Sequence, residues 1–188
     1  MWMKLFLAMI LIPGMILPAW RDLLKIKRIN VCDRVIGKRC IYKAYTIEDY
    51  LKKVAKGIEQ YSELYHLDPI MLLTIIKIES GFNPNIVGKD GEIGLCQIVP
   101  YGLAYKIGNL KIKRYRTNKT ILLKPEENIR ICAKYLNYCR FKCNTNNVDI
   151  IANCHNTGYC KEVINKRYLI KFRSWYNRIK KFIGTIDL

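Results

Sequence analysis

Residues 68–84 read DPIMLLTIIKIESGFNP, and this stretch decides the fold. Asp68 followed by Pro69 is a helix start signal, because aspartate caps free backbone N–H groups and proline suits the first helical position. Gly81 is a helix stop signal at the other end. The side chains between these signals are apolar around most of the helix, and such a helix is normally buried. The sequence therefore predicts a core helix from Pro69 to about Ser80.

One carboxyl lies at the end of this apolar helix. Glu79 is expensive to bury as an anion unless it is paired or protonated. Burial raises the pKa of a glutamate, and a carboxyl that stays protonated near neutral pH can act as a general acid. The alternative is a carboxylate that emerges into solvent at the helix end. The helix pattern alone leaves both interpretations open.

The rest of the chain also has mainly helical patterns. Thr46, with Asp49 three residues later, is a capping signal for an amphipathic helix that runs to about His66. Further helices are predicted from Pro125, from about Val148 to Cys154, and over a basic amphipathic end segment from Val163 to Ile183. No alternating pattern is long enough to require a large sheet, so the predicted fold class is mainly α.

The charge predicts an anionic partner. The chain has 33 basic and 15 acidic side chains, which give a formal net charge of +18. Charge of this size attracts nucleic acid, an anionic membrane surface or an acidic wall polymer. Basic side chains around Tyr115, at 111–119, are the kind that a nucleic-acid binder offers. The N-terminus argues against DNA, and we expect no nucleic-acid partner.

The N-terminal 19 residues have the pattern of an export signal. A short start with Lys4 precedes an uncharged apolar run, and Ala19 is a weakly marked cut site. Basic residues follow directly, so an uncleaved membrane anchor is the alternative. Residues 20–45 are basic, lack clear periodicity and are expected to be a tether or an extra wrap. We expect one catalytic domain over 46–188, in a monomeric protein of the periplasmic or extracellular envelope.

Eight cysteines agree with export, because an even and high count in a small exported chain predicts disulfides. Cys32 and Cys40 form the simplest local pair. Five more crowd into residues 132–160. Zinc held by this cluster with His155 is an alternative, which the missing C-x-x-C spacing disfavours. We therefore expect a disulfide framework and neither a metal nor another cofactor.

Two linked motifs carry a resemblance to a known family. ESGFNP at 79–84 is followed by GEIGLCQIVP at 91–100. This arrangement resembles the lytic transglycosylases of the soluble (SLT) type, relatives of goose-type lysozyme, which have E-S-x-F-N-P and then G-x-x-G-L-M-Q-x-x-P. Residues 128–136 and 154–158 are similar to two later family blocks. The resemblance implies a lysozyme-like helical domain with a substrate cleft.

The same resemblance implies roles for individual residues. Glu79 is the implied catalytic residue. The implied substrate-binding residues are Ser80, Gln97, Val99 (through its carbonyl), His155, Asn156 and Tyr168. Four positions depart from the family pattern: Gly88 replaces a serine, Cys96 a methionine and His155 a tyrosine, and Ile131 lies near the family's helix glycine. Histidine titrates near physiological pH, so His155 either makes the activity pH-sensitive or is a tolerated replacement.

The implied reaction needs one carboxyl. Glu79 would protonate the glycosidic oxygen between N-acetylmuramic acid and N-acetylglucosamine in peptidoglycan. It would then take the proton of the muramoyl C6 hydroxyl, which closes a 1,6-anhydro ring. Two alternatives stay open: hydrolysis of the same bond with help from Asp90 or Glu92, and a catalytically impaired wall-binding protein. A secretion, conjugation or phage machinery is a further partner that the sequence leaves undecided.

Overall fold

The computed structural model describes Lys4, Ala8 and residues 28–100, 102–108, 119–161 and 164–185. The export signal or anchor predicted at 1–19, apart from Lys4 and Ala8, and most of the basic stretch at 111–119 lie outside these residues. The elements are β1 (Ile29–Ile36), β2 (Arg39–Tyr45), α3 (Ile47–Tyr65), α4 (Pro69–Ser80), α5 (Leu103–Gly108), the 3-10 helix η2 (Lys119–Leu123), α6 (Pro125–Lys142), α7 (Val148–Thr157) and α8 (Lys166–Thr185). The mainly α prediction is confirmed.

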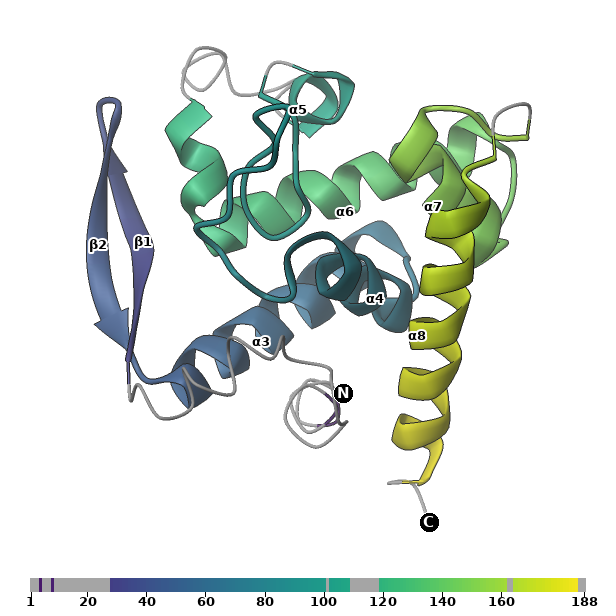
Figure 1. Cartoon of the computed structure of the whole chain (residues 1–188), viewed down its shortest axis with the longest axis horizontal. Helices are drawn as coiled ribbons and strands as arrows, with labels where there is room; N and C mark the ends of the chain where they lie inside the picture. The colour runs from purple at the N-terminus through teal and green to yellow at the C-terminus, as the bar shows by residue number, and fades with distance from the viewer. Residues whose placement is uncertain are drawn as a thin grey trace.

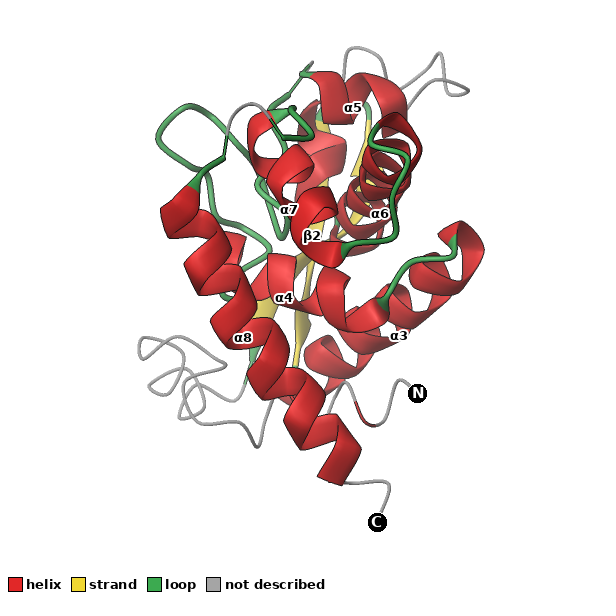
Figure 2. Cartoon of the chain, turned by 90° about the vertical axis from the view of Figure 1, so that its right-hand side faces the viewer, coloured by secondary structure: helices red, strands yellow, loops and turns green. Residues whose placement is uncertain are grey.

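Helix α4 lies at the centre of the domain and contacts α3, α7 and α8 (Figures 1 and 2). The predicted bounds are confirmed at both ends. The Asp68 side chain accepts a hydrogen bond from the backbone N–H of Ile70 at 2.7 Å. Gly81 follows the helix in the left-handed conformation, at φ +56°, which glycine adopts without a steric penalty. Local signals therefore fix both ends of the core helix.

One cation is buried on this helix. Lys77 is buried, and its Nζ lies 4.8 Å from the centre of the Trp175 ring on α8. Burial lowers the pKa of Lys77 to about 8. The contact with the face of an aromatic ring compensates part of the lost hydration of the ammonium. Lys77 thus fits into the core without interrupting the contact between α4 and α8.

Helix α3 supports the chain just after α4. Thr46 caps it by accepting a hydrogen bond from the Asp49 backbone N–H at 3.0 Å, as predicted. The buried Tyr50 hydroxyl donates to the carbonyl of Phe82 at 2.7 Å. That bond satisfies a buried carbonyl in the turn that follows Glu79. The first long helix therefore holds the turn at the end of the core helix.

Within the segment that was expected to be a tether or an extra wrap, residues 29–45 form a β-hairpin. β1 and β2 pair antiparallel around Gly37, and a bulge interrupts the register between Cys32 and Arg34. The hairpin stands beside the helical body in Figure 1. Most side chains of β2 are exposed, and the bulge breaks the alternation of β1, so the pattern that identifies a strand is weak. The predicted pair of Cys32 and Cys40 is confirmed as a disulfide across the hairpin.

Two more disulfides join the C-terminal helices. Cys139–Cys154 connects α6 to α7, and Cys143–Cys160 connects the end of α6 to the segment after α7. The zinc alternative is not supported: three of these sulfurs lie within 4.8 Å of one another, and the two bridges explain their closeness. Helix α7 continues to Thr157, beyond the predicted end at Cys154. In the described ranges, no helix combines the length and apolarity that a bilayer crossing requires.

The Cys143–Cys160 bridge gives a first prediction. Replacing both cysteines by serine should lower the free energy of unfolding by about 2 to 5 kcal/mol, because the bridge closes a loop with a sequence separation of 17 residues. Urea unfolding measures the change. The matched control is the double serine variant of Cys32 and Cys40, whose shorter loop lies outside the helical core and should have a smaller effect. An unchanged midpoint for the first variant would contradict the expectation.

Candidate active site

A cleft of about 360 Å³ opens at the C-terminal turn of α4. Helices α5 and α7, which both pack on α6, contribute to its two sides (Figure 1). Its lining residues are Glu79, Glu92, Cys96, Gln97, Ile98, Val99, Gly102, Leu103, Ala104, Tyr135, His155, Asn156, Thr157 and Gly158. The cleft therefore brings together residues from both halves of the chain, and it includes five of the seven predicted site residues.

Glu79 is held in a largely buried position beside the cleft. Its side chain is 18% exposed. Burial raises the pKa of the Glu79 carboxyl; His155 and Tyr168 lower it, and Glu92 raises it, with a net increase. The environment thus favours the protonated acid at a higher pH than for an ordinary glutamate. This arrangement supports the buried interpretation of Glu79 over the solvent-exposed one, and it suits a general acid.

Two side chains from other helices face the Glu79 carboxyl. The His155 Nδ1 atom lies 3.9 Å from Glu79 Oε1, and the histidine side chain is 9% exposed. Tyr168 on α8 is buried; its hydroxyl has no hydrogen-bond partner among the described residues, and its effect is to lower the pKa of the Glu79 carboxyl. Tyr168 is not among the residues that line the cleft. The structure thus places Tyr168 against the catalytic candidate, although it was predicted to bind substrate.

The glycine loop, residues 86–100, forms another part of the cleft wall. Gln97 has a left-handed backbone, at φ +46°, and its Nε2 donates to the Gly94 carbonyl at 2.9 Å. Gly94 has φ +77°, and a Cβ there would collide with Asn128 and with the Leu122 carbonyl. Val99 is exposed and lies in the cleft lining. Gln97 and Val99 therefore line the same cleft as Glu79.

Asn128 on α6 fixes the glycine loop. It is fully buried, and its Oδ1 accepts from the Cys96 backbone N–H at 2.9 Å. Its Nδ2 donates to the carbonyls of Ile93, at 2.9 Å, and Leu122, at 2.8 Å. The resemblance included Asn128 without giving it a role. One amide side chain satisfies three buried backbone groups, so it determines where the loop lies.

The two loop carboxylates are placed differently. Glu92 lines the cleft, whereas Asp90 is exposed and outside the lining. The Glu92 Oε2 atom accepts from the Asp90 backbone N–H at 3.0 Å. A Cβ at Gly88 would collide with Glu92 Oε2 and would come within 2.7 Å of Gln97 Oε1. Glycine at the position of the family serine thus leaves room for these two side chains.

Two predicted substrate-binding residues have other bonds. Ser80 is 2% exposed, and its hydroxyl donates to the Ile76 carbonyl and accepts from the Phe82 N–H. It stabilises the turn after α4, and it is absent from the cleft lining. Asn156 does line the cleft, but its Oδ1 accepts from Asn165 Nδ2 at 2.9 Å. Ser80 is therefore better explained as a structural residue, and Asn156 as part of the rim.

A buried thiol that the sequence analysis did not select also lies at the site. Cys132 on α6 is free, and its Sγ lies 3.9 Å from His155 Nε2. Cys96, the departure noted in the glycine loop, is the other free and buried cysteine among the described residues. No short-range sequence pattern links Cys132 to His155, because they are 23 residues apart on different helices. Only the packing of α6 against α7 brings them together.

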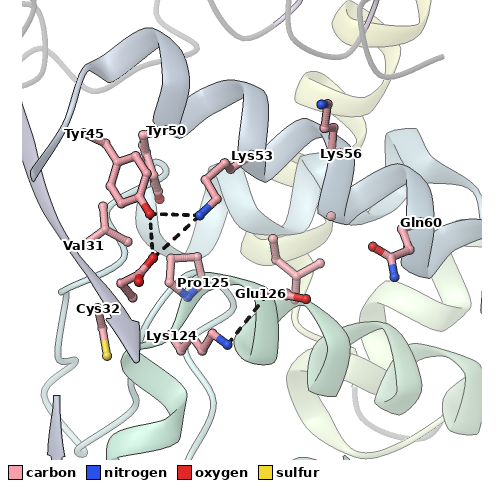
Figure 3. A pocket seen from close by; sticks show the side chains of 13 residues that line it. Val31, Cys32, Tyr45, Tyr50, Lys53, Lys56, Gln60, Lys124, Pro125 and Glu126 are labelled. Carbon is pink, nitrogen blue, oxygen red and sulfur yellow. Dashed lines mark hydrogen bonds and ion pairs between the residues drawn. The ribbon is translucent and has the colours of Figure 1, made fainter. Parts of the chain in front are cut away.

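A second cavity, of about 290 Å³, lies between the hairpin and helices α3 and α6 (Figure 3). Its polar groups are largely bonded to one another. The Tyr45 hydroxyl donates to Asp33 at 2.6 Å, and Lys53 donates to the Tyr45 hydroxyl at 3.0 Å. Lys124 pairs with Glu126. These bonds attach the hairpin to the helical body, so we assign the chemistry to the cleft at Glu79.

Comparisons with known proteins show what the chain is similar to. Residues 56–168 match the family model of the transglycosylase SLT domain. The chain is 34% identical over 79 residues to the membrane-bound lytic murein transglycosylase C of Photorhabdus laumondii. The matched stretch covers 42% of this chain and 22% of that protein. It is 32% identical over 85 residues to the protein of the same name from Mannheimia succiniciproducens. Here the matched stretch covers 45% of this chain and 24% of that protein. The chain thus matches about a quarter of the length of these relatives.

The bonds of Asn128 give a second prediction. Asn128→Ala should lower the free energy of unfolding by about 2 to 4 kcal/mol, because three hydrogen bonds to buried backbone groups are lost and only the Ile93 carbonyl keeps another donor, the Ile98 N–H. Urea unfolding measures the loss. Asn137→Ala on the same helix is the matched control, since the Asn137 Oδ1 has no hydrogen-bond partner among the described residues. Equal losses for the two variants would show that Asn128 has no special role.

Proposed function

The chain belongs to the transglycosylase SLT family, and on this premise we propose that it is a peptidoglycan lytic transglycosylase. The observation that carries the proposal is the Glu79 carboxyl, which is largely buried at the wall of a cleft of about 360 Å³ and has a raised pKa. A glycosidic oxygen is a weak base, so its cleavage needs a proton donor that is still protonated at working pH. The raised pKa of Glu79 is a shift in the direction that this role needs.

The proposed reaction has two proton transfers at one carboxyl. Glu79 first gives its proton to the oxygen that links N-acetylmuramic acid to N-acetylglucosamine, and the bond from muramoyl C1 to this oxygen breaks. Glu79, now a carboxylate, then takes the proton of the muramoyl C6 hydroxyl. The C6 oxygen bonds to C1 and forms the 1,6-anhydro ring, without consumption of water. His155 and Tyr168 both favour the carboxylate form of Glu79, which this second step requires.

The cleft lining supplies groups for the glycan. Val99 is exposed in the lining; its carbonyl accepts from the Gly102 N–H at 3.0 Å, and its second lone pair is the one that we expect to accept from amide or hydroxyl donors on the sugar. Asn156 adds an amide at the opposite rim. Gln97 uses its Nε2 within the loop, so its Oε1 is the atom that we expect to accept from a sugar hydroxyl. Ser80 and Tyr168 are not expected to contact the glycan.

The hydrolase alternative now depends on Glu92. Asp90 lies outside the cleft lining, whereas Glu92 lines the same cleft as Glu79 and raises the pKa of its carboxyl. A second carboxylate facing the same bond can position a water molecule for attack. Glu92 is therefore the residue on which hydrolysis would depend. A catalytically impaired wall-binding protein is less well supported, because Glu79 keeps an environment suited to an acid.

The proposed place of action is the cell envelope. The relatives are called membrane-bound murein enzymes, and the apolar stretch at 1–19 agrees with export or anchoring. The net charge of +18 attracts the chain to the carboxylates of peptidoglycan and to anionic polymers or lipids beside it. We therefore propose a periplasmic or extracellular enzyme that acts on peptidoglycan strands as a monomer.

The products give the third prediction. Mass spectrometry of sacculi digested by the protein should detect 1,6-anhydromuropeptides. Glu79→Gln should reduce the rate by about 10² to 10⁴-fold, because the amide cannot donate or accept the proton in the same way. The matched control is Glu92→Gln, an equally conservative change in the same cleft, which should leave the anhydro products in place. Two results together would establish the hydrolase instead: the unmodified protein releases only products with reducing ends, and Glu92→Gln no longer releases them.

A further inference from the structure

We propose that Cys132 is a positioning residue of this site: its buried sulfur holds the His155 imidazole through Nε2, so that Nδ1 faces the Glu79 carboxyl. The catalytic meaning of this inference rests on the proposed function, but the contact itself does not. Neither the family model nor the names of the relatives assign any role to a thiol. The inference also gives a role to the histidine that replaces the family's tyrosine.

Three groups from three helices form a row. The Cys132 sulfur lies 3.9 Å from His155 Nε2, and His155 Nδ1 lies 3.9 Å from Glu79 Oε1. Cys132 is fully buried, and the His155 side chain is 9% exposed. The Tyr135 ring packs at 5.9 Å from the imidazole, at an angle of 52°. The imidazole is therefore confined, with the thiol on one side and the carboxyl on the other.

The imidazole nitrogen that lacks a hydrogen-bond partner faces Glu79. His155 Nδ1 is buried and has no hydrogen-bond partner among the described residues. A buried ring nitrogen without a partner is costly, so it is expected to interact with the nearest charge. In this structure that charge is the Glu79 carboxylate, which forms when Glu79 has given its proton to the glycan. The two nitrogens of histidine are thus used in different ways, as in other sites where a second group orients the ring.

The sulfur fixes how the two ring nitrogens are directed. A Cys132 sulfur that accepts from the Nε2–H group holds the ring with Nδ1 directed at Oε1, and the Nδ1–H group of the protonated imidazole then stabilises the ionised carboxyl. This form is needed between the two proton transfers. An imidazole that is already protonated before the first step would lower the pKa of Glu79 and would remove the proton that this step requires. The state of His155 therefore limits the pH range in which Glu79 can act.

The ionisable groups around His155 support the arrangement. They are Glu79 on α4, Glu92 and Cys96 in the glycine loop, Cys132 and Tyr135 on α6, and Tyr168 on α8. Burial lowers the pKa of His155, but Cys132 and Glu79 raise it by more, with a net increase. Burial raises the pKa of Cys132, but Cys96 and His155 lower it to about 7. Burial keeps Cys96 protonated, so its thiol can donate to the Cys132 sulfur.

The fourth prediction is an NMR titration of His155 in the full chain without substrate. The chain has two histidines, so His66→Gln assigns the signals. In Cys132→Ala, the midpoint of His155 should fall by about 0.5 to 1 pH unit, which is the effect of losing one hydrogen bond to the imidazolium. The alkaline limb of the pH–rate profile of the same variant should move to higher pH, because a neutral His155 no longer lowers the pKa of Glu79.

Two variants separate this role from general destabilisation. Cys132→Ser places a hydroxyl at the position of the thiol, and its His155 midpoint should lie between those of the unmodified protein and Cys132→Ala. The serine variant also tests the proposal if the alanine variant does not fold. Ile129→Val removes a buried methyl group from the same helix, away from the cleft, and it should leave the His155 midpoint unchanged. An unchanged His155 midpoint in a folded Cys132 variant would overturn the proposal.

Two further outcomes are decisive. Alkylation of the denatured, unreduced protein should label two cysteines, Cys96 and Cys132; a fourth disulfide between them would overturn the proposal, because it removes the thiol. A shifted midpoint in a protein that releases no wall fragments would support the contact and contradict the proposed function. Wall cleavage with an unchanged midpoint would support the function and reject the role of Cys132.

Discussion

Helix α4 is covered on its sides by α3, α7 and α8, and its last turn nevertheless carries a carboxyl. The free energy of hydrating a carboxylate is large, so this position favours a protonated Glu79. Much of the surrounding structure follows from that constraint. The turn at Gly81 is held by Tyr50 and Ser80, and the glycine loop beside it is held by Asn128. The cleft is the opening that remains between these supports and α7.

Three of the departures from the family pattern, at Gly88, Cys96 and His155, have physical explanations in this chain. Gly88 leaves space that Glu92 and Gln97 fill, so a side chain at this position would collide with both. His155 occupies the place of an aromatic hydroxyl and brings a titratable ring to the carboxyl. Cys96 is small and buried, and it lies next to a second thiol, Cys132, which contacts that ring. The changes thus form one connected group next to Glu79, and they do not remove the acid.

The sequence predicted the helix boundaries, because residues close together in the chain determine them. Thr46, Asp68 and Gly81 bond to their own helices, so the bounds of α3 and α4 were readable from neighbours in sequence. The hairpin was missed because its second strand exposes most side chains and a bulge breaks the alternation of the first. The β-branched residues before Gly37, and Ile41 with two tyrosines after it, were the available signal. Cys132 and Asn128 act across helices and loops, and no local pattern reveals such contacts.

The protonation of Glu79 underlies both proton transfers, the pH dependence and the relation to His155. A ¹³C NMR titration of the side-chain carboxyl signals, with Glu79→Gln to assign the signal, measures it directly. We expect a midpoint for Glu79 clearly above the value of about 4.3 for an unperturbed glutamate, because burial outweighs the opposing effects of His155 and Tyr168. A midpoint at or below that value would mean that Glu79 is an ordinary carboxylate at neutral pH, and it would contradict its assignment as the general acid.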